Sequence, residues 1–342
     1  MERTNAYSLL DFLDNSPCNF FATATIQRYL DDNGFQELKQ SERWNLEKGG
    51  KYYVKKNDTA IFGFVIGETP LDQSGFNMIS AHSDSPCFRI KPNPEMLADG
   101  VLKLNTEVYG GPILYTWFDR PLSLAGRVIV RNPQNPARPI TKLIDFASPV
   151  LIIPHLAIHF NRNVNAGNPL SKQKDMLPIA AIVSDSMSKN NFLIDQIKER
   201  LEIADSKDIL DFDLMLYNCQ KSQLVGFNKE FICSGRIDDL SMAHAALSAL
   251  LNSDNPATTK VMAIFDNEET GSGTKQGAAS PVLASILHRV STCMGLDDEG
   301  FYQALSRSFL VSADNAHAAH PNYPEKYDPT NHPKMGGGPV IK

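Results

Sequence analysis

The sequence predicts an α/β domain that is assembled from both ends of the chain and interrupted by a β-rich module. Helical and strand-length apolar runs alternate before residue 88 and again after residue 230. Between these positions prolines recur and short strands dominate. Alternation of helices and strands favours layers around a largely parallel sheet. At 342 residues the chain also exceeds what one hydrophobic core usually serves, so two domains are expected.

The expected elements follow in order along the chain. Residues 6–33 are typical of two helices separated by Pro17, because apolar residues recur at helical spacing on both sides of it. Within the β-rich module, only 191–202 has a clear helical pattern. The remaining predictions are strands at 59–66 and 76–81, a helix at 241–251, a strand at 260–265, a helix at 281–290 and a strand at 308–313.

Charge and composition argue against several kinds of partner. A formal net charge of −6, with scattered lysines and arginines, leaves no basic face for nucleic acid. The longest uncharged apolar stretch, 146–160, is too short and too interrupted to span a bilayer, so no membrane partner is expected. The N-terminus lacks the pattern of a signal peptide. Five cysteines without a CxxC pair favour a reducing cytoplasm over a disulfide framework.

Acidic residues and one histidine stand at the ends of four apolar runs. In open α/β sheets, ligands bind at the carboxyl ends of the strands, so side chains at several strand ends are expected to converge. The four groups are His82 and Asp84 after 77–81, Asp238 and Asp239 before the helix at 241–251, Glu268 and Glu269 after 260–265, and Asp314 after 309–313.

The residue types in these groups fit a hydrolase with paired metal ions. A histidine followed two residues later by a carboxylate, as in His82 and Asp84, supplies an imidazole ligand whose ring the carboxylate orients. Nitrogen and oxygen ligands of this kind suit zinc, cobalt or manganese. One of Glu268 and Glu269 would bind metal while the other accepts a proton from water held between cations roughly 3.5–4 Å apart. Adjacency does not decide which glutamate has which role.

Each pattern taken singly has a simpler structural explanation. An isolated His-x-Asp is common in surface turns, a glutamate pair often lies at a solvated helix N-terminus, and an aspartate pair often caps a helix. It is the joint placement of the four groups that favours a metal centre. Residues 271–277 are rich in glycine but lack the Gly-Lys-Ser/Thr ending of a nucleotide loop. His244 is interpreted as a packed histidine on a helix.

Several long motifs occur in register along the chain. They are SAHSDSPCFRIKP at 80–92, VYGG at 108–111, LAIH at 156–159, GRIDDL at 235–240, FDNEETGS at 265–272, LVSADNAHAAHPNY at 310–323 and GPVIK at 338–342. In order and spacing these motifs resemble the aspartyl-aminopeptidase family of two-metal aminopeptidases, over nearly the whole length. The agreement of several long motifs is far more specific than any single His-x-Asp.

This resemblance implies the architecture and the activity together. The expected fold is a three-layer αβα metallopeptidase domain from residues 1–87 and 231–342, with a β-rich dimerisation domain inserted at 88–230. The expected protein is a cytoplasmic aminopeptidase that acts on peptides, prefers acidic N-terminal residues and uses two divalent ions, zinc with cobalt or manganese as alternatives. Dimers formed by the insert are expected to build a tetrahedral particle of twelve subunits.

The resemblance also assigns roles to single residues. It implies that His82 and Asp314 bind one metal, that Asp238 bridges both metals, and that Glu269 binds the second. Glu268 is then the general base, Asp84 orients His82, and the peptide between residues 238 and 239 is expected to be cis. Family members continue beyond the GPVIK motif to a final histidine ligand, which this sequence does not reach. Either the sequence is truncated, with a C-terminally incomplete catalytic domain, or the second metal is held by fewer protein ligands.

Substrate contacts and competing functions complete the expectations. An acidic substrate side chain needs a cation, and Lys342 and His317 are the candidates for it. His159, in the LAIH motif, is expected to reach a neighbouring active site, with the apolar 151–160 stretch at a subunit boundary. Two alternatives stay open: a related two-metal deacylase or carboxypeptidase, and a non-catalytic oligomeric homologue.

Overall fold

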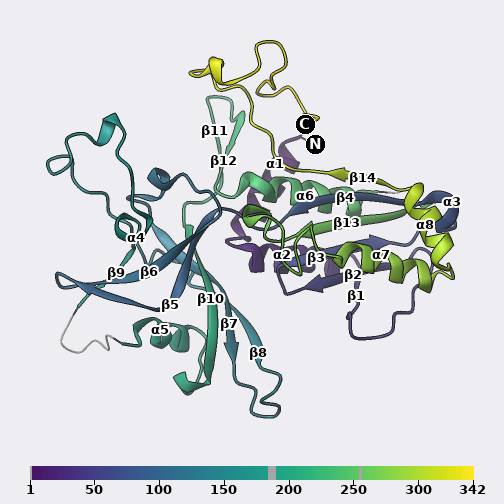
Figure 1. Cartoon of the computed structure of the whole chain (residues 1–342), viewed down its shortest axis with the longest axis horizontal. Coiled ribbons are helices and arrows are strands. Elements are labelled where there is room, and N and C mark those ends of the chain that lie inside the picture. Colours follow the sequence, from purple (N-terminus) through teal and green to yellow (C-terminus); the bar gives the residue numbers. More distant parts are fainter. Residues whose placement is uncertain (1, 184–189, 254–255) are drawn as a thin grey trace.

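The computed structural model describes residues 2–183, 190–253 and 256–342, and two six-stranded sheets dominate it (Figure 1). The first sheet draws its strands from both ends of the chain, in the order β1-β2-β3-β13-β4-β14. Its strands are β1 (Gln36–Glu37), β2 (Lys51–Lys56), β3 (Ala60–Val65), β4 (Phe76–His82), β13 (Thr259–Phe265) and β14 (Phe309–Ser312).

This first sheet is mixed, whereas the sequence predicts a largely parallel one. The pairs β1–β2, β13–β4 and β4–β14 are parallel, but β3 runs antiparallel to both β2 and β13. The reversal arises from a tight hairpin between β2 and β3, where Asn57 and Asp58 adopt positive φ angles that suit these residues in turns. The parallel part, β13-β4-β14, is the part that carries the candidate metal ligands.

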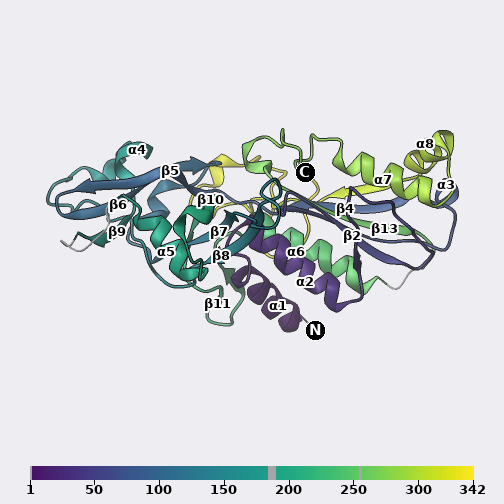
Figure 2. The ribbon, with the colours of Figure 1, turned by 90° about the horizontal axis from the view of Figure 1, so that it is seen from below.

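Helices cover both faces of the first sheet, which gives the three layers that the resemblance implies (Figure 2). One face carries α1 (Glu2–Asp14), α2 (Asn19–Asp32) and α6 (Ile237–Asn252). The opposite face carries α3 (Leu71–Ser74), α7 (Val282–Cys293) and α8 (Asp298–Ser306). The αβα architecture is therefore confirmed.

Alternating side chains of the central strands build the two cores between these layers. In β3, Ile61 packs with α1, α2 and α6, whereas Phe62 and Phe64 pack against the α7 and α8 side. In β13, Ile264 packs on the α1, α2 and α6 side, and Ala263 packs on the α7 and α8 side. Successive strand side chains point to opposite faces, so a strand that is covered on both faces becomes apolar throughout. This explains why residues 60–65 form an unbroken apolar run.

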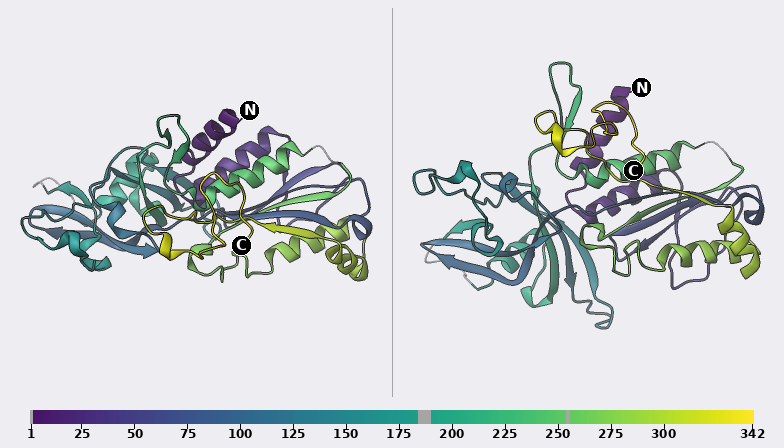
Figure 3. Two further views of the ribbon diagram at one scale, coloured as in Figure 1. Left: turned by 90° about the horizontal axis from the view of Figure 1, so that it is seen from above. Right: turned by 45° about the horizontal axis from the view of Figure 1, so that its top comes forward.

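The second sheet is antiparallel in all its described pairings and lies beside the first, so the molecule is elongated (Figures 1 and 3). A helix, α5 (Phe192–Arg200), packs Leu193 and Ile197 into the core of this sheet. In the order of the sheet, its strands are β8 (Ile140–Asp145), β7 (Leu122–Val130), β10 (Ile209–Asn218), β5 (Cys87–Ala98), β6 (Val101–Tyr109) and β9 (Ile179–Ile182).

The smaller elements connect these parts. A hairpin of β11 (Gln223–Val225) and β12 (Phe231–Cys233) precedes α6, and a short helix α4 (Lys172–Asp175) lies near β6. The predicted helices and strands are all present, with ends shifted by a few residues. Within the described part of the chain, no helix is long and apolar enough to cross a membrane.

Candidate metal centre

The parallel strands β13, β4 and β14 end at one edge of the first sheet, and the candidate ligands follow these ends. In the register of the sheet, Phe265 of β13 pairs with His82 of β4, and Ser312 of β14 pairs with Ser80 of β4. Residues that lie shortly after Phe265 and Ser312 therefore meet near His82. Glu268 and Glu269 stand in a single turn of 3-10 helix after β13, and Asp314 stands two residues after β14.

The first turn of α6 brings the remaining carboxylates to the same edge. Asp238 and Asp239 lie in this turn with non-helical backbone angles, and the peptide between them is cis, as the resemblance implies. Asp239 is fully buried and accepts a hydrogen bond from the backbone N–H of His82 at 3.1 Å. This bond ties the start of α6 directly to the end of β4.

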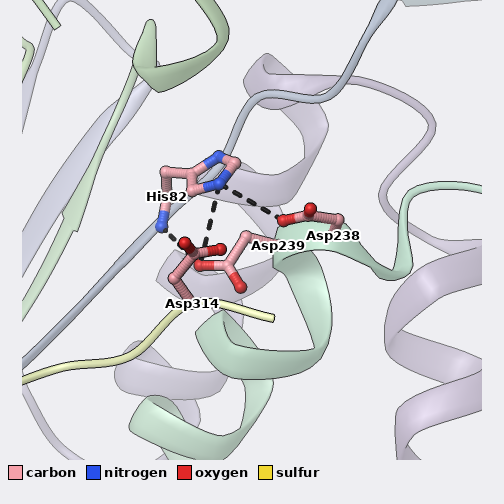
Figure 4. A group of neighbouring side chains, drawn as sticks. All are labelled: His82, Asp238, Asp239 and Asp314. Atoms are coloured by element: carbon pink, nitrogen blue, oxygen red, sulfur yellow. Dashed lines mark hydrogen bonds and ion pairs between the residues drawn. The ribbon is translucent and has the colours of Figure 1, made fainter. Parts of the chain in front are cut away.

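Several carboxylates surround the imidazole of His82 (Figure 4). His82 Nε2 lies 3.5 Å from Asp238 Oδ1, 3.8 Å from Glu268 Oε2 and 3.9 Å from Asp239 Oδ2. Two overlapping sets of side chains each bring one potential ligand atom per residue within 4.8 Å of the others. These sets are His82, Asp238, Asp239 and Asp314, and His82, Glu268 and Glu269.

Asp84 lies on the opposite side of the imidazole from these carboxylates. His82 Nδ1 is 3.2 Å from Asp84 Oδ1 and 3.1 Å from the backbone oxygen of Asp84. A proton on Nδ1 satisfies these acceptors, so Nε2 faces the other carboxylates and is the nitrogen that would bind a metal ion once it has lost its own proton. A ring held in this way and flanked by carboxylate oxygens is a donor set that fits zinc or a similar divalent cation.

The protonation of the cluster reflects its crowded negative charge. Burial alone would lower the pKa of His82, but hydrogen bonds to Asp238 and Asp84 and the charge of Asp239 raise it to about 11. Burial raises the pKa of Asp239 to about 7. Burial and the neighbouring charge of Asp84 raise the pKa of Glu269 to about 7 as well. Several carboxylates so close together favour protons or a cation, which would relieve their mutual repulsion.

Burial differs across the site in a way that suits catalysis. His82, Asp84 and Asp239 are buried and form its floor, whereas Asp238, Glu268 and Asp314 are exposed. The floor is therefore shielded from solvent, and the open side is accessible to a ligand.

The predicted substrate residues differ in their positions. Lys342 Nζ donates to Asp314 Oδ2 at 2.6 Å, so its ammonium lies at the edge of the cluster. His317 and His159 are both exposed, and neither belongs to the convergent sets found among the described residues. His244 packs on Phe12 and bonds to Ser8, in agreement with its interpretation as a packed histidine.

Three residues near the centre have no role in the sequence analysis. Asp239 was visible there as half of an aspartate pair, and the structure places it inside the ligand set. Asn315, next to Asp314, donates to Asp239 Oδ1 at 3.1 Å and to the backbone oxygen of Ile237 at 3.0 Å. Tyr109, in the VYGG motif, donates to Asp84 Oδ2. Its place in that motif was the one sequence signal for Tyr109, because a tyrosine at the end of a strand does not by itself indicate a functional role.

An imidazole and several carboxylates at the carboxyl edge of an αβα sheet define the chain as a protein of the metallohydrolase class. The comparisons with known proteins agree. Residues 12–342 match the family described as Aminopeptidase I zinc metalloprotease (M18). The probable M18 family aminopeptidase 2 of Clostridium novyi (strain NT) is 52% identical over 338 residues, which cover 98% of this chain and 78% of that protein.

Solved structures extend the similarity to three dimensions. The cryo-EM structure of the Ape4 and Nbr1 complex shares 34% identity with a TM-score of 0.91, over 97% of this chain and 67% of that chain. The S. cerevisiae mApe1 dodecamer has the same fold at 24% identity with a TM-score of 0.83, over 96% of this chain and 75% of that chain. The chain belongs to the M18 family of zinc metallo-aminopeptidases, which are hydrolases.

Proposed function

We propose that the chain removes acidic N-terminal residues from peptides at the His82 cluster and uses two divalent metal ions. Zinc is the ion that we propose first, with cobalt or manganese as alternatives. The observation that carries this proposal is the pair of overlapping ligand sets that share His82. His82 and Asp314 would bind one ion, Glu269 the other, and Asp238 both. When bound, the ions polarise the scissile carbonyl and lower the pKa of the attacking water.

The remaining side chains then divide the work of proton transfer and orientation. Glu268 is exposed beside His82, so its carboxylate is free to accept the proton of the attacking water and to return it to the leaving amine. Asp84 accepts a hydrogen bond from Nδ1–H of His82 and keeps the ring aimed at the cluster.

Lys342 supports the preference for acidic residues. Its ammonium pairs with Asp314 in the structure, but a metal ion and Lys342 compete for that carboxylate. When Asp314 binds metal, the ammonium becomes available to an Asp or Glu side chain of the substrate. His317, which is exposed three residues after Asp314, is the second candidate for this contact.

Chromogenic amides of Asp, Glu, Leu and an N-acetylated amino acid, assayed with and without zinc or manganese, test the proposal. We expect metal-dependent hydrolysis of the free-amine substrates, fastest for Asp and Glu. Release of acetate from the N-acetylated amide, with no cleavage of the free-amine amides, would identify a deacylase instead. No hydrolysis of any substrate in the metal-loaded protein would favour a non-catalytic homologue.

We also propose that residues 88–230 form a dimerisation domain attached to a catalytic domain of residues 1–87 and 231–342. The loop after Ile153 exposes large apolar side chains, with Leu156 57% and Phe160 80% exposed. Apolar residues clustered on a surface are typical of interfaces. His159 lies within this exposed stretch, so a dimer contact there would bring it to a partner, and a particle of twelve subunits would be built from such dimers.

Sedimentation of Phe160→Ser tests the proposed interface. We expect this variant to dissociate, whereas Phe227→Ser, at a still more exposed phenylalanine between β11 and β12, should keep the assembly of the unmodified chain. A fully active monomer of the unmodified chain would contradict the interface and the role of His159. The five cysteines are all unpaired, which supports the proposal of a cytoplasmic location.

A further inference from the structure

The end of β6 brings a side chain of the second sheet to the metal centre. Tyr109 is the last residue of β6, and its ring packs in the buried cluster that contains Cys18, Cys87 and Met215. Its hydroxyl donates to Asp84 Oδ2 at 2.7 Å and accepts a hydrogen bond from Asn267 Nδ2 at 2.8 Å. One phenol therefore joins two motifs of the first sheet that are far apart in the sequence.

The carboxylate of Asp84 is fully engaged by its donors. Oδ1 receives His82 Nδ1 and the backbone N–H of Glu268, each at 3.2 Å. Oδ2 receives the Tyr109 hydroxyl and the backbone N–H of Glu269, the latter at 3.2 Å. One buried carboxylate thus orients the imidazole and the turn that carries both glutamates. Tyr109 makes the shortest of these four bonds and is the donor that comes from the second sheet.

Asn267 is the second partner of the phenol and immediately precedes the glutamates. Its backbone has a left-handed conformation with φ of 63°, and its Oδ1 accepts from Thr274 Oγ1 at 2.8 Å and Gln276 Nε2 at 2.9 Å. The hydrogen bond to Tyr109 engages the amide nitrogen of the same side chain. Without the phenol oxygen, the Asn267 amide would lose the contact that links it to the second sheet.

The residue after Tyr109 also approaches the glutamate turn closely. Gly110 has φ of +69°, and a Cβ atom at this position would lie 3.0 Å from Glu269 Cβ and 3.2 Å from Glu269 Oε2. A side chain at residue 110 would therefore press on Glu269. Hydrogen bonds from Tyr109 and backbone contact from Gly110 are two separate observations that bring β6 to the same turn.

We propose that Tyr109 is a positioning residue, which holds Asp84 and Asn267 so that His82 and the turn with Glu268 and Glu269 keep the geometry that binds metal. The inserted sheet thereby becomes part of the metal centre through the end of β6. This inference rests on the metal-binding role proposed above for His82 and Glu269. Tyr109 acts on the metal centre through these neighbours.

Tyr109→Phe is the direct test, because it removes the hydroxyl and keeps the packed ring. Loss of a residue that orients metal ligands typically lowers metal affinity or activity about 10- to 100-fold. We therefore expect zinc affinity, measured by competition with a chromogenic chelator, to fall at least about tenfold. The kcat on Leu-amide should fall in a similar range, and KM should change by less than about twofold.

Tyr217→Phe is the matched control. The Tyr217 hydroxyl also donates to an aspartate, Asp145 Oδ1, at 2.7 Å and within the same sheet. Among the described residues, no hydrogen bond or ion pair joins Asp145 to a proposed ligand. Removal of the Tyr217 hydroxyl should leave zinc affinity unchanged even if the melting temperature falls. An equal loss of zinc affinity in both variants would show a general effect on the inserted sheet and would overturn the inference.

A double-mutant cycle with Asp84→Asn shows whether Tyr109 acts through Asp84. If it does, the combined loss of zinc affinity is smaller than the product of the two single losses, because residues in one network are not additive. Unchanged zinc affinity in Tyr109→Phe would overturn the inference. A loss of zinc affinity in a chain that hydrolyses no amide would leave the inference standing and contradict only the proposed activity.

Discussion

The first sheet presents its candidate ligands directly at the ends of β4, β13 and β14, whereas the second sheet contributes to the same centre only through the end of β6. The ligands are charged and partly exposed, and the contacts from β6 are a buried phenol and a glycine. We infer from this difference that the α/β part supplies the reactive groups of the proposed site, whereas the geometry of the site depends also on the inserted part. Substitutions in the two regions should therefore differ in kind as well as in size.

The largest effect is expected at Glu268, in the first region. Glu268→Gln removes the proposed base without changing the shape of the side chain, and general acid–base catalysis contributes about 100- to 10,000-fold to a rate. We expect kcat to fall within that range while zinc content, measured by elemental analysis, stays unchanged. Glu269→Gln should instead lower the zinc content. The reverse pattern would exchange the roles of the two glutamates.

A substitution of Lys342 tests whether the segment after β14, which lies outside both sheets, determines the preference for acidic substrates. Lys342→Ala removes a charge-assisted hydrogen bond of about 1.5–3 kcal/mol, or roughly 10- to 100-fold. We expect kcat/KM to fall by this factor for Asp-amide and far less for Leu-amide. Lys334→Ala, at an exposed lysine of the same segment, is the control and should affect neither substrate. Equal losses on both amides would remove Lys342 from the pocket.

A pair of glycines sharpens the comparison within the second sheet. Gly100 and Gly110 both have positive φ, but a Cβ at Gly100 meets nothing within 4 Å, whereas one at Gly110 meets Glu269. Each change to alanine should cost about 1–2 kcal/mol of unfolding free energy through backbone strain. Only Gly110→Ala should also weaken zinc binding. If both variants bind zinc like the unmodified chain, the contact of β6 with the metal centre has no consequence for metal binding.

The smallest effect concerns pH. A metal ligand must lose its proton, and the folded chain holds protons on His82 up to a pKa of about 11 and on Glu269 up to a pKa of about 7. Zinc affinity should therefore rise with pH. About three protons should be released per chain below pH 7, where Asp239 also holds a proton up to a pKa of about 7, and about one above it. Calorimetry in two buffers of different ionisation enthalpy counts these protons. Release that does not change across pH 7 would exclude Glu269 as a ligand.

The elements and the ligand cluster of the first sheet could be predicted because their signals are local. Strands covered on both faces read as apolar runs, and the residues that follow them in the sequence also follow them in space. His82, the glutamate pair and Asp314 were found in this way. The motifs then supplied the roles that position alone left open.

The contacts of the second sheet could not be predicted in the same way. The bond from Tyr109 to Asp84 depends on how two sheets are packed, and no periodicity in the sequence encodes that arrangement. The hairpin at Asn57 and Asp58 was missed for a related reason, because an apolar run of strand length does not indicate whether the strand is parallel or antiparallel to its neighbours. Asp239 was recognised as part of a pair, but only the fold shows its hydrogen bond with the backbone of His82.

Anomalous diffraction from crystals of the zinc-loaded chain, recorded at the zinc edge, tests most directly whether the His82 cluster binds metal. We expect two peaks roughly 3.5–4 Å apart, one beside His82 and Asp314, the other beside Glu269, with Asp238 between them. Peaks away from His82, or none in a fully loaded chain, would contradict the assignment of this cluster as the metal centre.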